Sequence, residues 1–301
     1  MFPELDQFLL SCRRRRLAEN TIVNYQYLFH RFTAANSLTD IQSITVAHIE
    51  TYLDAYQHLA SATIYKQLSL LRTMFNWLDD RALIHSNPFR YYELPRFTRH
   101  LRESIPLPDL ERLLAYIPGD PLRRQCYLYS GYRDNLIWNF CALAGMRISE
   151  VLALRVGDLR ENGIYIRHAK ANRSRVVPML PRMAAAVDRY QPYLHYQLAR
   201  APREDDYLFP GDAGPLATPY IWARFKRALD MLDLRRYTFH NLRHTYATLL
   251  LREGVNLPTM QKLLGHASLT STQLYLHVQD DEVTQAALKH PLASSSDAHG
   301  V

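Results

Sequence analysis

The 301 residues suffice for two compact domains, and a composition of 48% hydrophobic and 22% charged residues argues against global disorder. The net charge is +7 and 31 of the 36 basic residues are Arg, which favours a polyanionic partner such as nucleic acid or an anionic membrane surface. Three Cys are too few for a disulfide framework, and no apolar run approaches the roughly 20 residues that span a bilayer. We therefore expect a cytoplasmic protein without a membrane anchor.

The first third of the chain has the apolar periodicity of helices. This periodicity recurs in three segments, residues 20–35, 44–56 and 61–79. Each segment begins near a residue that commonly caps a helix, namely Asn20, Thr45 and Ser61. The pattern predicts a small helical bundle, which we place at residues 1–95.

The chain then changes character over residues 96–108. Prolines are interspersed with arginines from Asn87 to Pro108, a stretch that ends with this region, for example at Pro95, Arg99, Arg102 and Pro106. Because proline lacks a backbone donor and resists helix formation, we expect an extended basic linker between two domains.

The second domain is predicted at residues 109–290, followed by a polar tail at 291–301. After a connection over residues 118–132, a long apolar helix ends at Gly145, in the usual position for a C-terminal glycine. Residues 163–179 alternate apolar and polar side chains around a polar centre, which indicates a β-hairpin or small sheet. The rest of the domain is predicted to be helical.

Two short motifs in this domain carry basic residues at helix starts. AGMRISEVLAL places Arg147 just before a helix, where its side chain can face an anion. TFHNLRHTYAT begins a helix at Thr238 and places His240 and Arg243 on one face, three residues apart. Taken alone, these residues have ordinary structural explanations, as exposed arginines and a partly buried histidine.

Lys170 lies in the polar turn of the predicted hairpin. It is the only lysine between Lys66 and Lys226, and arginines surround it at positions 167, 173 and 175. A lysine can transfer a proton, whereas an arginine in a protein effectively cannot. Lys170 is therefore a candidate general acid, although chance could also place a lysine here.

The last motif is GVNLPTMQKLLGHASLTSTQLYLH. It predicts a helix that begins at Asn256, ends at Gly265 and is followed directly by His266. A short helix then begins near Thr270 and carries Tyr275. A single tyrosine among 20 is usually a packing residue. A functional role for Tyr275 therefore depends on the other motifs of the chain.

Together these segments resemble the tyrosine recombinase and phage integrase family, and its bacterial Xer-type branch most of all. The resemblance covers residues 133–280 in AGMRISEVLAL, the hairpin lysine before VVP, HNLRHTYAT, LLGH and the tyrosine nine residues later. It implies a mainly α (α+β) fold, with an N-terminal helical, SAM-like core-binding domain and a mostly helical catalytic domain with a small β-sheet. The positions that match the family's active site are Arg147, Lys170, His240, Arg243, His266 and Tyr275.

The resemblance also implies a mechanism. Tyr275 would attack a DNA phosphate to give a 3′-phosphotyrosyl link, while the two arginines and His266 stabilise the charge on the phosphate. His240 would accept the tyrosine proton and Lys170 would protonate the departing 5′-oxygen. Because one ester replaces another, we expect no cofactor, ATP or metal ion.

The expected partner is double-stranded DNA at specific sites, bound by a homo-tetramer or together with a partner recombinase. In the family the C-terminal segment, here residues 281–290, packs on a neighbouring protomer. Two alternatives stay open: a type IB topoisomerase-like enzyme, which relaxes supercoils without strand exchange, and a catalytically silent DNA-binding regulator of the same fold.

Overall fold

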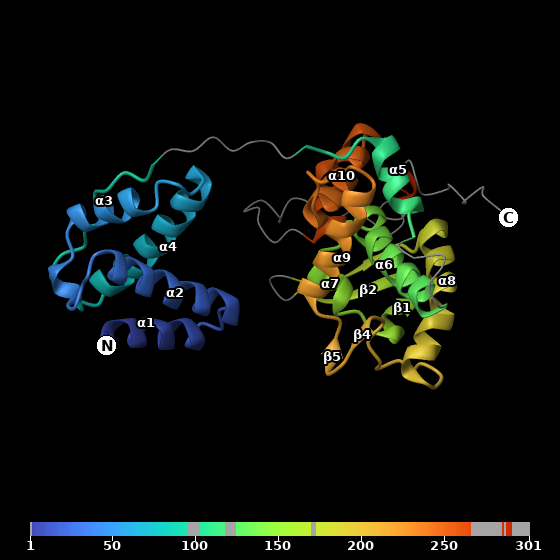
Figure 1. Cartoon of the computed structure of the whole chain (residues 1–301), viewed down its shortest axis with the longest axis horizontal. Coiled ribbons are helices and arrows are strands. Elements are labelled where there is room, and N and C mark those ends of the chain that lie inside the picture. The colour runs from blue at the N-terminus through green and yellow to red at the C-terminus, as the bar shows by residue number, and fades with distance from the viewer. Residues whose placement is uncertain are drawn as a thin grey trace. The chain divides into compact units, whose positions relative to one another are not determined.

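The chain divides into two compact units, residues 1–101 and 102–301 (Figure 1). Each unit has its own hydrophobic core. The computed structural model describes residues 2–95, 103–117, 125–169, 173–265, 285 and 287–290. Within these residues, no helix combines the length and apolar character needed to cross a membrane.

The N-terminal unit is a bundle of helices. They are α1 (Pro3–Arg14), α2 (Glu19–Ala35), α3 (Val46–Ala55) and α4 (Ser61–Asp79), with a 3₁₀ turn at Ile41–Ser43. Aromatic residues from α1, α2 and α4, including Phe8, Phe32 and Phe75, are fully buried at its centre. The three predicted helices are confirmed, whereas α1 was not predicted.

The predicted caps of these helices are only partly correct. Thr45 is the N-cap of α3, as expected. The caps of α2 and α4 are instead Ala18 and Ala60, neither of which makes a side-chain cap hydrogen bond. Because both helix starts are exposed, water can satisfy their first N–H groups.

The C-terminal unit is mainly helical around a small sheet. Its elements are α5 (Leu107–Ala115), α6 (Gln125–Leu143), α7 (Ile148–Leu152), a 3₁₀ turn (Val156–Asp158), β1 (Leu159–Arg160), β2 (Gly163–Ala169), β3 (Arg173–Val177), α8 (Pro181–Leu198), β4 (Pro210–Gly211), β5 (Gly214–Pro215), α9 (Thr218–Met231), α10 (Phe239–Arg252) and α11 (Leu257–Leu264). Helix α6 is central, because it packs against α5, α7, α8, α9 and α10. Its described side chains are buried almost all round, and they include polar residues such as Arg133 and Asp134 as well as apolar ones.

The predicted hairpin is confirmed, with β2 and β3 antiparallel. Val177 pairs with Ile164 and Arg175 pairs with Ile166, and a register shift lies between Ile166 and Ala169. Strand β1 adds a third strand to this sheet. This strand and the β4–β5 ribbon were not predicted, since strands of two residues carry no periodicity.

The segment expected as a long connection is partly helical. Helix α6 begins at Gln125, so residues 125–132 belong to its first turns.

Helix α5 begins at Leu107, two residues before the expected domain start. Ile105 is buried in the C-terminal core, and its N–H donates to Thr245 Oγ1 on α10 at 2.8 Å. Residues 96–102 of the predicted linker lie outside the described residues, and the domain limits of 95 and 108 stay predictions.

The described residues near the C-terminus contact the core of their own chain. Ala287 is buried there, and the His290 ring stacks on Tyr246 with ring centroids 5.7 Å apart. Burial, together with the charge of Arg182, lowers the pKa of His290 to about 4. The predicted contact of residues 281–290 with a second protomer stays a prediction.

A buried ion cluster joins α6 to α9. The Asp134 carboxylate accepts hydrogen bonds from Arg133 Nε at 2.9 Å and Nη2 at 2.7 Å, and its other oxygen accepts from Arg224. Asp134 and Arg133 are both buried. Removing a single partner from such a cluster leaves a buried charge without compensation.

We therefore expect Asp134→Asn to lower the free energy of unfolding of the C-terminal unit by about 3–5 kcal/mol. Urea denaturation followed by tryptophan fluorescence measures the change. The matched control is Asp109→Asn, which removes an exposed pair with Arg112 and should have little effect. Equal losses in the two variants would contradict a structural role for the buried cluster.

Candidate active site

The site is built where the end of α6 meets α10 and α11. Gly145 follows α6 with φ +59°, and a Cβ at this position would lie 2.5 Å from the Tyr246 ring. Only glycine allows both the backbone conformation and this close approach. The chain then reverses into α7, whose N-cap is Arg147, as the sequence predicts.

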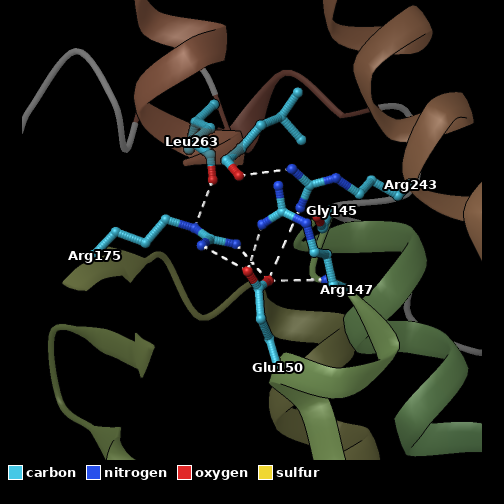
Figure 2. A network of polar contacts seen from close by, with 7 residues as sticks. Gly145, Arg147, Glu150, Arg175, Arg243 and Leu263 are labelled. Atoms are coloured by element: carbon cyan, nitrogen blue, oxygen red, sulfur yellow. Dashed lines mark hydrogen bonds and ion pairs between the residues drawn. The ribbon is translucent and has the colours of Figure 1, made fainter. Parts of the chain in front are cut away.

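Glu150 is the centre of the polar network (Figure 2). Its carboxylate accepts hydrogen bonds from the backbone N–H of Arg147 at 2.9 Å and from Arg147 Nη1 at 2.7 Å. Arg175 on β3 donates from Nη2 at 2.8 Å and from Nη1 at 3.2 Å. Arg243 Nη1 on α10 lies 3.9 Å from Glu150 Oε2. The carboxylate thus holds together three arginines that are distant in the sequence.

Arg243 is held by backbone carbonyls as well as by charge. Its Nη1 donates to the Gly145 carbonyl and its Nη2 donates to the Leu264 carbonyl at 2.7 Å. Burial, followed by repulsion from Arg147, lowers the pKa of Arg243 to about 10. The guanidinium therefore stays charged at neutral pH, in a position that packing fixes.

The network carries more positive than negative charge. Three guanidinium groups face one carboxylate, and Arg175, Arg243 and Glu150 have side chains no more than 8% exposed. The Arg147 side chain is 28% exposed and gives the cluster its access to solvent. An excess of buried positive charge that opens to solvent favours an anionic ligand, and arginine suits the oxygens of a phosphate.

The charge state of Glu150 makes stability depend on pH. Burial would raise its pKa, but the hydrogen bonds and charge of Arg175 and the hydrogen bonds from Arg147 outweigh burial and lower the pKa to about 2. Since the folded pKa lies below the unfolded value of 4.5, the stabilisation is present above about pH 4.5 and is lost as pH falls towards 2.

We expect Glu150→Gln to lower the free energy of unfolding most at pH 6. The difference in this free energy between wild type and variant should shrink between pH 4.5 and pH 2. Urea denaturation of both proteins at several pH values measures this difference. If the difference in unfolding free energy stays constant over this pH range, the lowered pKa of Glu150 is wrong.

The structure brings together two of the six residues predicted for the site, Arg147 and Arg243. His240 is exposed in the first turn of α10, whose N-cap is Thr238 as predicted. Lys170, His266 and Tyr275 lie outside the described residues.

The sequence motifs did not point to Glu150, and they placed Arg175 only among the arginines near the hairpin turn. A signal existed for each of them. Glu150 stands three residues after the N-cap Arg147, at the spacing of a capping box. Arg175 stands two residues before the buried Val177, on the same face of β3.

No group of three or more His, Cys, Asp or Glu side chains suited to a metal ion occurs among the residues that the structure describes.

The fold is that of a mainly helical, two-unit protein with a cluster of three arginines around Glu150 in its C-terminal unit. Residues 108–282 match the model of the phage integrase family, and residues 5–85 match that of the phage integrase N-terminal SAM-like domain. The first match covers more than half of the chain, so the protein belongs to the phage integrase family. The family and fold class predicted from the motifs are thereby confirmed, and the enzyme class is DNA strand transfer.

The relatives and similar structures agree with this assignment. Tyrosine recombinase XerC of Herpetosiphon aurantiacus is 29% identical over 309 residues, which cover 99% of this chain and 98% of the relative. The chain also resembles a λ integrase dimer bound to a core site, with a TM-score of 0.68 and 18% identity over 88% of this chain and 94% of that one. A λ integrase tetramer bound to a Holliday junction gives a TM-score of 0.64, with 17% identity over 89% and 78% of the two chains. At these identities the structures support the fold alone.

Proposed function

We propose that this protein recombines duplex DNA at specific sites by cutting and rejoining strands through a 3′-phosphotyrosyl link to Tyr275. The observation that supports this best is the network around Glu150, in which the buried Arg243 and the partly exposed Arg147 carry excess positive charge. Family membership favours recombination over the topoisomerase-like and silent-regulator alternatives.

The two arginines would bind the non-bridging oxygens of the scissile phosphate. Charge builds up on these oxygens as the nucleophile attacks, and donors that are already in place stabilise it without reorganisation. A guanidinium carries five N–H donors, more than Arg243 needs for its two carbonyl contacts. His266 would add a further hydrogen bond to the same phosphate.

Two proton transfers accompany the exchange of esters. A tyrosine phenol has a pKa near 10 and is protonated at neutral pH, so His240 would accept its proton during the attack. Lys170 would protonate the 5′-oxygen that leaves, giving a free 5′-hydroxyl. A 5′-hydroxyl from another strand then attacks the phosphotyrosyl bond, which joins the two DNA strands and releases Tyr275. Because the number of ester bonds is conserved, the cycle consumes no ATP, and the proposed roles call for no metal ion.

Recombination requires two DNA sites held together. We infer a homo-tetramer on paired duplexes, the assembly seen for λ integrase on a Holliday junction. A tetramer shared with a partner recombinase is the alternative form of this assembly. The reaction would take place in the cytoplasm, where chromosomal and plasmid DNA lie.

Covalent capture tests the proposed chemistry even though the target sequence is undefined. The protein is incubated with nicked duplexes of random sequence, and DNA that stays bound to protein in detergent is sequenced. We expect adducts in EDTA that are enriched in one sequence, with protein on the 3′ end and a free 5′-hydroxyl. An absence of adducts from every pool would contradict the proposal.

The captured site then separates the rival functions. Two labelled duplexes that carry it should exchange strands if the protein is a recombinase. Relaxation of supercoils without exchange would support a topoisomerase-like enzyme. A silent regulator would already differ in the capture experiment, where it would bind DNA without forming any covalent adduct.

A further inference from the structure

Arg175 is a buried arginine in a strand whose neighbouring residues are exposed. Ser174 and Val176 face solvent, whereas the Arg175 side chain is only 7% exposed. The register explains this burial, because Arg175 pairs with the buried Ile166 and paired residues share a face of the sheet. A guanidinium is therefore directed from β3 into the C-terminal unit.

The Arg175 guanidinium joins α7 to the end of α11. Its Nη groups bind the Glu150 carboxylate of α7, and its Nε donates to the Leu263 carbonyl of α11 at 3.0 Å (Figure 2). The last carbonyls of a helix lack partners within the helix and carry its partial negative charge. Arg175 satisfies the Leu263 carbonyl, and Arg243 satisfies that of Leu264.

Gly265 lies next to the same Arg175 guanidinium. It ends α11 with φ +64°, and a Cβ built on it would lie 2.7 Å from Arg175 Nη1. The planar Arg175 side chain therefore lies against the backbone of Gly265. His266 is the next residue in the chain.

We propose that Arg175 is a positioning residue, which ties β3 and Glu150 to the end of α11 and thereby fixes the chain directly before His266, the predicted donor to the scissile phosphate. This inference rests on the proposed function and adds to it a residue that does not touch the substrate. Lysine cannot replace Arg175, because one ammonium group cannot span the carboxylate and the Leu263 carbonyl with the geometry of a fork.

A double-mutant cycle tests whether Arg175 acts through His266. The assay is single-turnover cleavage of a nicked duplex that carries the captured site, at saturating protein. We expect Arg175→Lys to slow cleavage by about 10- to 100-fold, as a misplacement of around 1 Å does. In a His266→Ala background the same change should cost less than about threefold, because coupled residues are not additive. Equal losses in both backgrounds would overturn the proposal.

The matched control is Arg167→Lys in the neighbouring strand β2. Arg167 also pairs with a buried carboxylate, that of Asp158 at 2.6 Å, but this ion pair involves neither α7 nor α11. Its substitution should leave the cleavage rate close to that of wild type. A loss equal to that of Arg175→Lys would indicate a general effect on the sheet and would also overturn the proposal.

A second variant covers the case in which Arg175→Lys folds poorly, as judged by its thermal unfolding. Gly265→Asn keeps a residue that tolerates positive φ but adds a Cβ against the Arg175 guanidinium. It should slow cleavage at unchanged DNA affinity, and this loss should again shrink in the His266→Ala background. The wild-type protein tests the proposed function separately: if it forms no adduct, the proposed function is wrong. If wild type is active but Arg175→Lys causes the same loss with and without His266→Ala, only the proposed role of Arg175 is wrong.

Discussion

Replacing Tyr275 by phenylalanine is expected to abolish the covalent protein–DNA adduct. Phenylalanine keeps the ring but lacks the hydroxyl that attacks phosphorus, and loss of a nucleophile commonly costs at least about 10⁴-fold in rate. Cleavage of the captured nicked duplex, followed on a denaturing gel, measures the effect. Affinity for the uncut site should be unchanged, since the substitution removes no charge.

The control for this experiment is Tyr196→Phe, at an exposed tyrosine on α8. It removes the same hydroxyl from a position outside every motif, and the adduct should form as in wild type. If Tyr275→Phe still formed the adduct, a different residue would be the nucleophile and the proposed mechanism would be wrong.

Arg243→Lys is expected to have the second largest effect, a loss of about 10²- to 10³-fold in the cleavage rate, as for removal of one transition-state donor. The lysine keeps the charge but cannot contact the Gly145 and Leu264 carbonyls while it also binds phosphate oxygens. Single-turnover rates at saturating protein separate this loss from weaker DNA binding.

Arg252→Lys is the matched control for Arg243, because Arg252 is exposed in the last turn of the same helix. Thermal unfolding of both variants shows how much of each protein is folded under the assay conditions. A cleavage rate of Arg243→Lys within a few-fold of wild type would contradict the proposed contact with the phosphate.

Features that depend on local chemistry could be predicted from the sequence. Thr45, Thr238 and Asn256 are N-caps as expected, and Gly265 ends α11 in the left-handed conformation. Local patterns failed where a helix began without a cap hydrogen bond, as at Ala18. They also failed for strands of two residues, whose pairing depends on distant parts of the chain.

Only the site residues that lie in the family motifs could be predicted from the sequence. Arg147 and Arg243 were identified from the family resemblance, and the structure joins them through Glu150. The sequence holds a local signal for Glu150 and for Arg175, but their contacts with each other and with α11 could not be predicted, because α7, β3 and α11 are distant in the sequence. Their buried charges are satisfied only by the tertiary fold.

The central claim is that Tyr275 forms the bond to DNA, and peptide mapping of the trapped adduct tests it most directly. The adduct is digested with protease and nuclease, and the peptide that retains a nucleotide is identified by mass spectrometry. We predict that the modified residue is Tyr275, one of 20 tyrosines in the chain. A nucleotide on any other residue would show that Tyr275 is not the nucleophile.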